Sequence, residues 1–474
     1  MSRSVESSIE EQLRARSAPL EFGRRRHWLD TPRARAIACA ASASLGIAFA
    51  VAIFYPGYMS PDSIEQLSQA RSALFTDWHP PLISFLWHFT DRVLPGPGGM
   101  LLLNNVLFWS AAALICYHCL HRTAPLITLA VGLFPPVFGL LSTVWKDVTF
   151  GAAMVLAFAL LFHAQLTRSR AAWAFSFLPL LYALAARHNS PPAVYALGLY
   201  GGWIFWRIIR GIASWRFAFA TGSLSFLVLL ASVILINRQL VADRRMHIEQ
   251  TILLHDLTAI SLDRQAVLLP KWVRRDGSTP TLEELRSIYH PFGLVSLFCC
   301  DPKVSLEQTT DPSALATLRR LWATAIYHHF GAYLRHRWKV FLGILGTAHS
   351  CYPYHDGISD NSLGVTFRFT RVNRIVMEVL STLGNSVLFR PWLYLCVIVL
   401  LLVGSIWVSP NFRAPALALG SSALAYEVAY LWVGPSCDFR LSWYLALAAL
   451  LMPLLFVGAL GTRRRSMERP DAQG

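Results

Sequence analysis

The chain contains repeated runs of apolar residues, each about 18 to 20 residues long and nearly free of charged side chains. A helix of that length crosses about 30 Å of hydrocarbon, and helices satisfy all their backbone hydrogen bonds internally in lipid. Of the 474 residues, 54% are hydrophobic and only 15% are charged, which is too apolar for a soluble protein of this length. The pattern predicts an all-α polytopic membrane protein.

About ten membrane spans are predicted from apolar length and from the distribution of Lys and Arg. They cover residues 36–55, 99–120, 125–142, 148–165, 171–186, 191–207, 217–236, 389–408, 414–433 and 442–460. The loops after the second, fourth, sixth and eighth spans are basic, as is the chain after the last span. Basic loops mark the cytoplasmic side of a membrane. We therefore expect both termini to be cytoplasmic, in a bacterial inner membrane.

The formal charge of the chain is +15, from 42 basic and 27 acidic residues. Such an excess can indicate nucleic-acid binding. Here, however, the basic residues are concentrated in the tails 1–35 and 462–474 and in short loops between spans. That distribution orients a protein in a bilayer. The predicted partner is therefore the lipid bilayer and not nucleic acid, and the basic tail 1–35 is expected to be flexible.

Two long segments lie on the side opposite the basic loops. The first is the loop 56–98, within a membrane region 36–236 that holds the first seven spans. The second, 237–388, is long enough for an extracytoplasmic domain and precedes a second membrane region, 389–461.

Helix-start signals occur repeatedly in the predicted extracytoplasmic domain. Thr279 with Pro280, and Asp311 with Pro312, are typical of helix starts, so the domain is expected to be mainly helical. Near its end, basic residues are spaced three apart among apolar ones, as in a helix that lies at a membrane interface. These residues are Arg368, Arg371 and Arg374.

The eight cysteines fall into two groups. Cys39, Cys116, Cys119 and Cys396 lie in predicted spans, where a thiol behaves as a small apolar side chain. Cys299, Cys300, Cys351 and Cys437 lie in predicted outer segments, where a disulfide is chemically allowed. The CYHC sequence at 116–119 has the spacing of half a zinc site, but no second pair accompanies it. Metal binding there is not expected.

The first outer loop begins with the sequence SPDSIEQ, in which Ser60 can cap a helix and Pro61 can occupy its first position. Asp62 then lies in the first turn, beside the positive end of the helix dipole, and is expected to be ionised. An ionised carboxylate there can accept a proton from a hydroxyl or help to hold a metal ion. The alternative is that Asp62 only stabilises the start of the helix.

Further polar residues follow in the same loop. Glu65 comes three residues after Asp62, on the same helix face, where it either shares a site or is simply solvated. In the sequence DWHPPL, two prolines restrict the backbone after Asp77 and His79. His79 is a candidate catalytic residue, although a histidine in such a loop is more often a structural hydrogen-bonding group.

Three more polar pairs lie at the predicted outer ends of spans. They are Lys146 with Asp147, Arg187 with His188, and Asp438 with Arg440. Mutual neutralisation or snorkelling of a long side chain would explain any one of them. Three basic sites on one face instead indicate an anionic ligand, for which a lipid phosphate is the natural candidate.

The sequence LLHDLTAIS, with His255, Asp256 and Ser261, contains the residue types of a hydrolase triad. It lacks the glycines that surround a nucleophilic serine in hydrolases, so a covalent serine mechanism is not expected. The chain also has no phosphate-binding P-loop, dinucleotide fingerprint or HExxH metal motif.

Taken together, the motifs resemble those of the GT-C superfamily of membrane glycosyltransferases, which includes protein mannosyltransferases and aminoarabinose transferases. The resembling motifs are SPDSIEQ, DWHPPL, WKD at 145–147, RHN at 187–189 and DFR at 438–440. In that family the first outer loop carries an essential acidic residue, which corresponds to Asp62, and forms paired surface helices, the arrangement expected here for 56–98. This chain departs from the family in having His79 before its paired prolines and Glu65 as the nearest second carboxylate.

The resemblance implies transfer of a sugar from a polyprenyl-phosphate carrier to an extracytoplasmic glycan, lipid or protein acceptor, on the periplasmic face and with inversion. Asp62 and His79 would be catalytic, and the three pairs at the span ends would bind substrate or phosphate. A divalent cation such as Mg²⁺ or Mn²⁺, held with the help of Asp62 and Glu65, is a candidate cofactor. The alternatives are a transporter or flippase for a lipid-linked sugar, an O-antigen polymerase or ligase, and a membrane scaffold without chemistry.

Overall fold

The computed structural model describes residues 28–467 except 212–213, 243, 275, 300–302 and 348–351. Within these residues the chain is built from helices, and its β contacts are isolated bridges. Six segments are long and apolar enough to cross a membrane: α2 (Pro32–Phe54), α5 (Gly98–Cys119), α8 (Lys146–Thr167), α12 (Trp215–Val241), α19 (Pro410–Val433) and Phe439–Gly461, which combines η6 (Phe439–Ser442) with most of α20 (Trp443–Met467). The prediction of a helical membrane protein is confirmed.

The other four predicted spans are helical but interrupted, short or less apolar. The segment predicted at 125–142 forms α6 (Ala124–Gly132) and α7 (Pro135–Leu141), which are bent by 65° and make at most one further span. Pro135 and Pro136 explain the break, because proline lacks an amide hydrogen and disfavours helical geometry in the residue before it.

The remaining three are α9 (Arg170–Phe175) with α10 (Phe177–Ala186), α11 (Pro191–Arg210), and α18 (Pro391–Gly404) with η5 (Ser405–Trp407). The segments Arg170–Ala186 and Pro391–Trp407 are apolar but shorter than the six long helices. A count of ten spans is therefore not confirmed.

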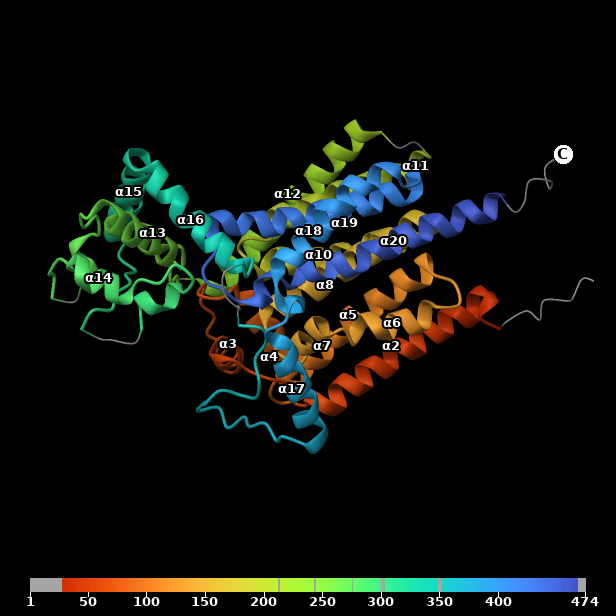
Figure 1. Ribbon diagram of the computed structural model, residues 1–474, viewed down its shortest axis with the longest axis horizontal. Coiled ribbons are helices and arrows are strands. Elements are labelled where there is room, and N and C mark those ends of the chain that lie inside the picture. The colour runs from red at the N-terminus through yellow and green to blue at the C-terminus, as the bar shows by residue number, and fades with distance from the viewer. Residues whose placement is uncertain are drawn as a thin grey trace, which may run out of the picture.

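The first outer loop folds into two helices that pack against each other, α3 (Pro61–Ser72) and α4 (Pro81–Val93). Both start with proline, as predicted, and α3 ends where Ala73 takes a left-handed conformation with φ of 55°. The residues between the helices include His79, whose direction is limited by the two prolines that follow it. This hairpin closes one end of the bundle (Figure 1).

A separate helical unit projects beyond that end of the bundle (Figure 1). It contains α13 (Glu249–Arg264), η2 (Lys271–Val273), α14 (Leu282–Ile288), η3 (Leu294–Leu297), α15 (Pro312–His328) and α16 (Phe330–Ile344), around its own apolar core. Asp311 caps α15 as predicted, but α14 is capped by Thr281 in a capping box with Glu284, two residues later than expected. We call this unit the outer domain.

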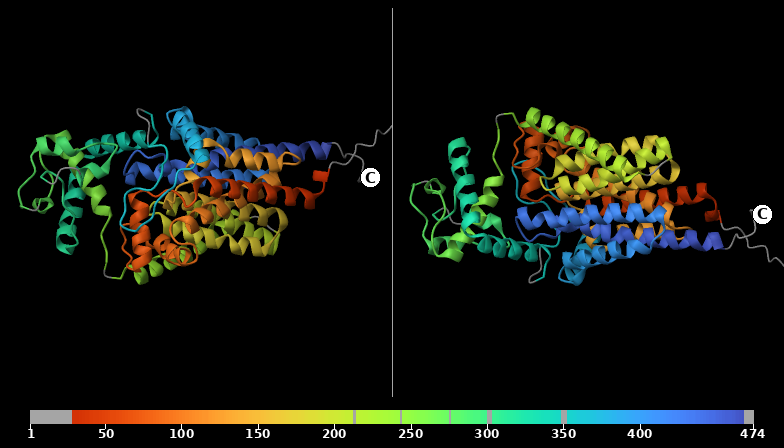
Figure 2. Two further views of the ribbon diagram at one scale, coloured as in Figure 1. Left: turned by 90° about the horizontal axis from the view of Figure 1, so that it is seen from below. Right: turned by 90° about the horizontal axis from the view of Figure 1, so that it is seen from above.

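The last helix before the final spans is α17 (Arg371–Gly384), which is followed by η4 (Val387–Phe389). Helix α17 lies across the direction of the spans, beside the end of the bundle that carries α3 and α4 (Figures 1 and 2).

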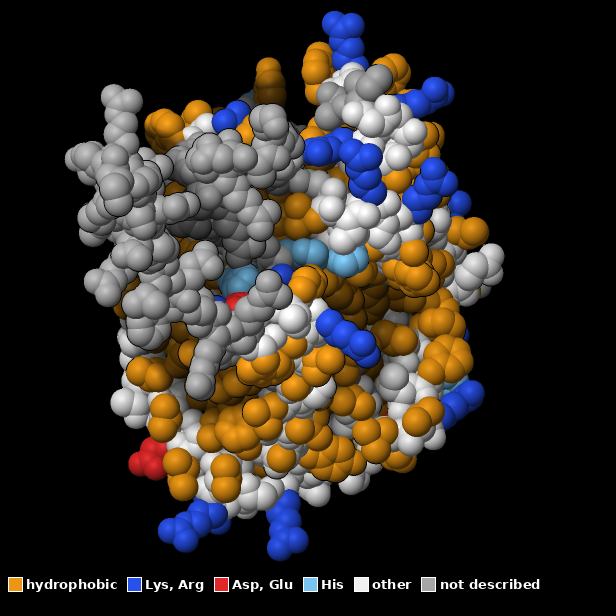
Figure 3. Space-filling view, turned by 90° about the vertical axis from the view of Figure 1, so that its right-hand side faces the viewer, with side chains coloured by type: hydrophobic (Ala, Val, Ile, Leu, Met, Phe, Trp, Pro, Cys, Tyr) orange, Lys and Arg blue, Asp and Glu red, His pale blue; other side chains and the backbone are white. Residues whose placement is uncertain are grey.

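The first and last described helices have their free ends at the far end of the bundle (Figure 1). Lys and Arg side chains are scattered around the rim of that face (Figure 3). Residues 1–27 of the predicted tail lie outside the described part of the chain, which begins with η1 (Trp28–Asp30). Helix α2 starts at Pro32, inside the predicted tail 1–35, and α20 continues to Met467, inside the predicted tail 462–474.

Candidate functional site

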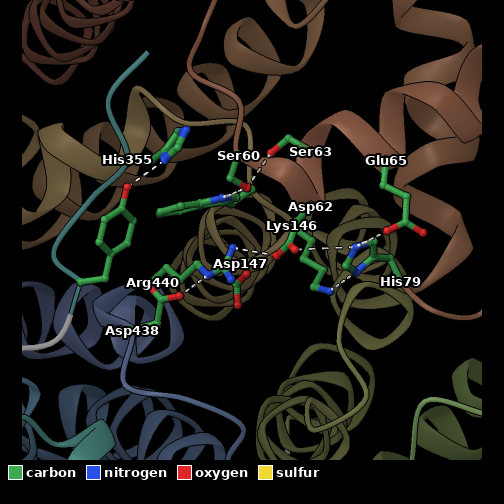
Figure 4. Close-up of polar contacts among 12 residues, drawn as sticks. Ser60, Asp62, Ser63, Glu65, His79, Lys146, Asp147, His355, Asp438 and Arg440 are labelled. Carbon is green, nitrogen blue, oxygen red and sulfur yellow. Dashed lines mark hydrogen bonds and ion pairs between the residues drawn. The ribbon is translucent and has the colours of Figure 1, made fainter. Parts of the chain in front are cut away.

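Polar residues from five distant segments meet at the end of the bundle beneath the α3–α4 hairpin. Figure 4 shows those from the α3–α4 hairpin, the start of α8 and the turn before α20. The segments are the start of α3, the turn before α4, the start of α8, the turn between α10 and α11, and the turn before α20. Each of them had been predicted to lie on the outer face. We call this group the end-of-bundle site.

Asp62 is held by a cation from the opposite end of the chain. Its Oδ2 atom lies 3.0 Å from Nη1 of Arg440, and its side chain remains 36% exposed. Burial raises the pKa of this carboxyl, but the surrounding groups, of which Arg440 has the largest effect, lower it more, so the pKa lies well below its usual value. Asp62 is therefore ionised, as predicted, yet it is paired and not simply solvated at a helix start.

The start of α3 is fixed by the start of α8. Ser60 occupies the capping position, but its side chain makes no capping hydrogen bond. Its Oγ atom instead accepts a hydrogen bond of 2.8 Å from Nε1 of Trp145, while Ser63 donates one of 2.6 Å to the backbone oxygen of Val144. The guanidinium of Arg440 lies 4.6 Å from the centre of the Trp145 ring. Ser60 therefore stands at the predicted cap position, but its oxygen bonds to Trp145 and not to the first amides of α3.

His79 is buried between a lysine and two carboxylates. Nζ of Lys146 lies 2.6 Å from Nδ1 of His79, and Nε2 lies 3.5 Å from Glu65 and 4.0 Å from Asp62. An ammonium group can only donate, so Nδ1 accepts and the proton of the neutral ring sits on Nε2, facing the carboxylates. Burial, helped by Lys146, lowers the pKa of His79. The ring therefore connects Lys146 to Glu65 and Asp62.

Asp147 and Arg187 form a buried ion pair one residue further into α8. Nη1 of Arg187 lies 2.7 Å from Oδ1 of Asp147, and Nη2 donates a 2.8 Å hydrogen bond to the hydroxyl of Tyr430. Tyr430 in turn shares a 2.8 Å hydrogen bond with Tyr426. The pairing joins two of the predicted phosphate-binding segments, whereas the adjacent His188 is exposed.

Asp438 lies on the other side of Arg440, with Oδ2 3.0 Å from Nε of that residue. Burial raises the pKa of Asp438 to about 6, although Arg440 opposes this shift. The backbone around Asp438 is tied to Tyr352 by a parallel bridge and by a 3.0 Å hydrogen bond from the amide of Phe439. Arg440 is thus shared between two carboxylates, one exposed in part and one largely buried.

The neighbouring Cys437 and Cys299 are each in a disulfide, as allowed for the predicted outer cysteines. Cys300 and Cys351 lie outside the described residues. The four cysteines predicted in spans, Cys39, Cys116, Cys119 and Cys396, are free thiols.

Some residues of the site had no usable signal in the sequence. Tyr430 and His355 are single aromatic residues in apolar or irregular stretches, and only the fold brings them to the charged group, whereas Trp145 belongs to the WKD motif at 145–147. Conversely, Asp77 is not part of the cluster: it accepts a hydrogen bond from the backbone amide of Met246, next to the outer domain. Its role in the hairpin is structural.

Within the described part of the chain, no group of three or more His, Cys, Asp and Glu side chains is placed to hold a metal ion. Oδ2 of Asp62 lies 3.0 Å from Nη1 of Arg440, and Oε2 of Glu65 lies 3.5 Å from Nε2 of His79, so both carboxylates face nitrogen atoms and not a shared cation position. The arrangement therefore does not fit the divalent cation that the sequence suggested.

The formal charges of six residues in the end-of-bundle site balance. Asp62, Asp147 and Asp438 face Lys146, Arg187 and Arg440. An arriving phosphate would have to replace a carboxylate as the partner of Arg187 or Arg440, whereas the polar contact of Lys146 is to His79. Searches of protein-family models, of curated proteins and of solved structures give no significant match to this chain.

Proposed function

We propose that the protein is a membrane glycosyltransferase that moves a sugar from a polyprenyl-phosphate carrier to an acceptor hydroxyl at the end-of-bundle site. The observation that carries this proposal is the ion pair between Asp62 and Arg440. It joins the first outer loop to the last one and leaves an ionised carboxylate partly exposed among buried cations. Such a group is suited to handle a hydroxyl next to an anionic leaving group.

In this proposal Asp62 orients the acceptor hydroxyl and receives its proton. The hydroxyl oxygen attacks the anomeric carbon, the bond from that carbon to the phosphate oxygen breaks, and its electron pair leaves with the phosphate. Because its pKa is low, Asp62 is a weak base, so the proton moves only once the new bond makes the hydroxyl acidic. A single displacement of this kind inverts the anomeric carbon.

Lys146, Arg187 and Arg440 would stabilise the charge that develops on the departing phosphate. Fixed cations in a site with little water are typically worth a few kcal/mol per contact, about 3 kcal/mol for one donor. Lys146 is the cation least engaged by a carboxylate, because its polar contact is to the neutral imidazole of His79. We therefore assign the first phosphate contact to Lys146, with His79 as the positioning residue that holds it.

A transporter or flippase for a lipid-linked sugar is the second candidate, and one observation favours it. Glu427 is fully buried within α19, where Oε1 accepts a 2.7 Å hydrogen bond from Ser442 and Oε2 has no hydrogen-bond partner. Buried acids inside membrane helices often carry protons in coupled transport. The concentration of the other charges at one end of the bundle favours surface chemistry instead.

Mass spectrometry of glycans and carrier lipids in a strain that lacks the gene tests the proposal. We expect one sugar to be missing from an envelope glycan, lipid or protein, and its polyprenyl-phosphate form to accumulate where an added glycosidase or phosphatase outside the inner membrane can reach it. Reintroduction of the intact gene should restore the sugar. Accumulation of the carrier only on the cytoplasmic side would support transport, and unchanged glycans and carriers would contradict both functions.

A further inference from the structure

Helix α17 exposes an apolar stripe. Val372, Ile375 and Val379 follow one another at spacings of three and four, and each is 54% exposed. Side chains at these spacings share one helix face. Phe369, just before the helix, is also exposed. A contiguous apolar face of this kind is not left in water without a partner.

A different face of α17 is already occupied by the protein. The amide of Asn373 donates to the backbone oxygen of Ile53 at 3.2 Å and to the hydroxyl of Tyr58 at 2.6 Å. Leu380 is buried and packs near Gly139 of α7. Because Ile53 belongs to the last turn of the span α2, these contacts place α17 at the depth where a span leaves the hydrocarbon.

The polar edge of α17 carries an excess of positive charge. Arg368, Arg371 and Arg374 are all exposed, and within the described residues none of them forms an ion pair with a carboxylate. Glu378 is the single acidic residue of the helix. Three exposed guanidinium groups beside an apolar stripe match a layer of phosphate groups above acyl chains.

We propose that α17 lies in the headgroup layer of the leaflet on the side of the end-of-bundle site and binds anionic phospholipids there. The apolar stripe enters the boundary of the acyl chains, and the three arginines contact lipid phosphates. A soluble partner or a second copy of the chain would have to supply both an apolar face and carboxylates at the depth of the headgroups. The bilayer supplies both phosphate and hydrocarbon at that depth without any further partner.

Binding of α17 to lipid would also fix the chain that covers the site. The segment before α17 contains His355, whose Nε2 lies 3.0 Å from the backbone oxygen of Met59, and Ile358, which forms a bridge with Met59. Met59 directly precedes Ser60 in the chain. The leaflet would thus help to hold the start of α3 in place, whatever reaction the site performs.

Photo-crosslinking tests where the apolar stripe lies. A photoreactive amino acid is placed at Ile375 or Val379 in the full-length protein, which is then reconstituted in nanodiscs of phosphatidylcholine and phosphatidylglycerol. Ser381, an exposed residue on another face of α17, is the matched control position. We expect probes at Ile375 and Val379 to form lipid adducts and the probe at Ser381 to form few. Adducts to another protein chain, or equal lipid yields at all three positions, would overturn the proposal.

A second arm tests the headgroup preference. Adducts at Ile375 should contain phosphatidylglycerol above its mole fraction, by a factor on the order of five, which is what one arginine at a lipid surface provides. The triple variant Arg368→Gln, Arg371→Gln, Arg374→Gln should reduce this enrichment to the mole fraction. The control triple Lys271→Gln, Arg286→Gln, Arg320→Gln, at exposed positions of the outer domain, should leave it unchanged. Enrichment that survives the first triple would contradict lipid binding by these arginines.

Discussion

Among the described residues, an Asp, Arg and His cluster in the end-of-bundle site and another in the outer domain differ in their access to water. In the site, Asp62 pairs with Arg440 beside His79, and the aspartate is 36% exposed. In the outer domain, Asp256 pairs with Arg337 and His336, and the aspartate and the arginine have no exposed surface.

The partners of Asp256 leave little room for a ligand. Its carboxylate lies 2.7 Å from Nε of Arg337 and 3.3 Å from Nε2 of His336, and it accepts a 2.8 Å hydrogen bond from Nε1 of Trp322. Arg337 also donates to the backbone oxygen of Gly434, in the turn that leads to Asp438. The same residue types are therefore structural where the carboxylate is buried among partners from its own chain, and suited to chemistry where one carboxylate remains accessible.

The largest expected effect comes from breaking the outer-domain cluster. Arg337→Met leaves the buried carboxylate of Asp256 without its cation, which typically costs about 3 to 5 kcal/mol in the free energy of unfolding. Thermal unfolding of the purified protein measures the loss. Arg319→Met, which removes an exposed ion pair with Glu249, is the control and should cost less than about 1 kcal/mol. Equal stabilities of the two variants would refute the structural role of the buried cluster.

A smaller, pH-dependent effect is expected at Asp438. Its pKa is raised to about 6 in the folded chain, so its protonated form stabilises the fold fully below the usual value of 3.8, and this contribution disappears as the pH rises through about 6. The free energy of unfolding of the wild type minus that of Asp438→Asn should therefore fall by up to about 3 kcal/mol between pH 4 and pH 7. Unfolding measured across this range gives the difference. A difference that does not change with pH would show that Asp438 is not buried as described.

The smallest effect is expected from Trp145→Phe. The variant loses the hydrogen bond from Nε1 to Ser60 but keeps a ring beneath Arg440, and one such bond contributes about 1 kcal/mol to stability. Trp173→Phe, which loses a similar bond to the backbone of Gly201, is the matched control away from the site. Both variants should unfold with similar small losses, while only Trp145→Phe should shift the pKa of Asp62 or reduce transfer. If Trp145→Phe and Trp173→Phe have the same effect on the pKa of Asp62 and on transfer, Trp145 has no role in the site.

The sequence predicted which segments are apolar helices because hydrophobic length is a local property of the chain. It did not predict how many of them cross the membrane, because the bend at Pro135 and the short helix α10 depend on how the helices pack. The common location of the site segments followed from the alternation of basic loops. The pairings did not follow: Asp62 could be paired with any outer cation, and nothing in the chain indicated Arg440 over Lys146 or Arg187.

The buried cluster of the outer domain illustrates the same limit. His255 and Asp256 are adjacent in the sequence and were considered as parts of a hydrolase triad. In the structure the carboxylate of Asp256 contacts Arg337 and His336 from α16. The hydroxyl of Ser261 donates a hydrogen bond to the backbone oxygen of Leu257 in its own helix. Residue type and spacing alone could not separate this cluster from the accessible one, because burial is set by the tertiary fold.

The most direct test of the central claim is the activity of Asp62→Asn, expressed in the strain that lacks the gene and compared with wild type at equal amounts in the membrane. Asparagine keeps the shape of the side chain but cannot accept the proton of a hydroxyl or carry charge. We expect the variant to fold and accumulate normally while sugar transfer, followed by glycan mass spectrometry, falls by at least about a thousandfold. Transfer at the wild-type rate by Asp62→Asn would contradict the assignment of the end-of-bundle site as the place of chemistry.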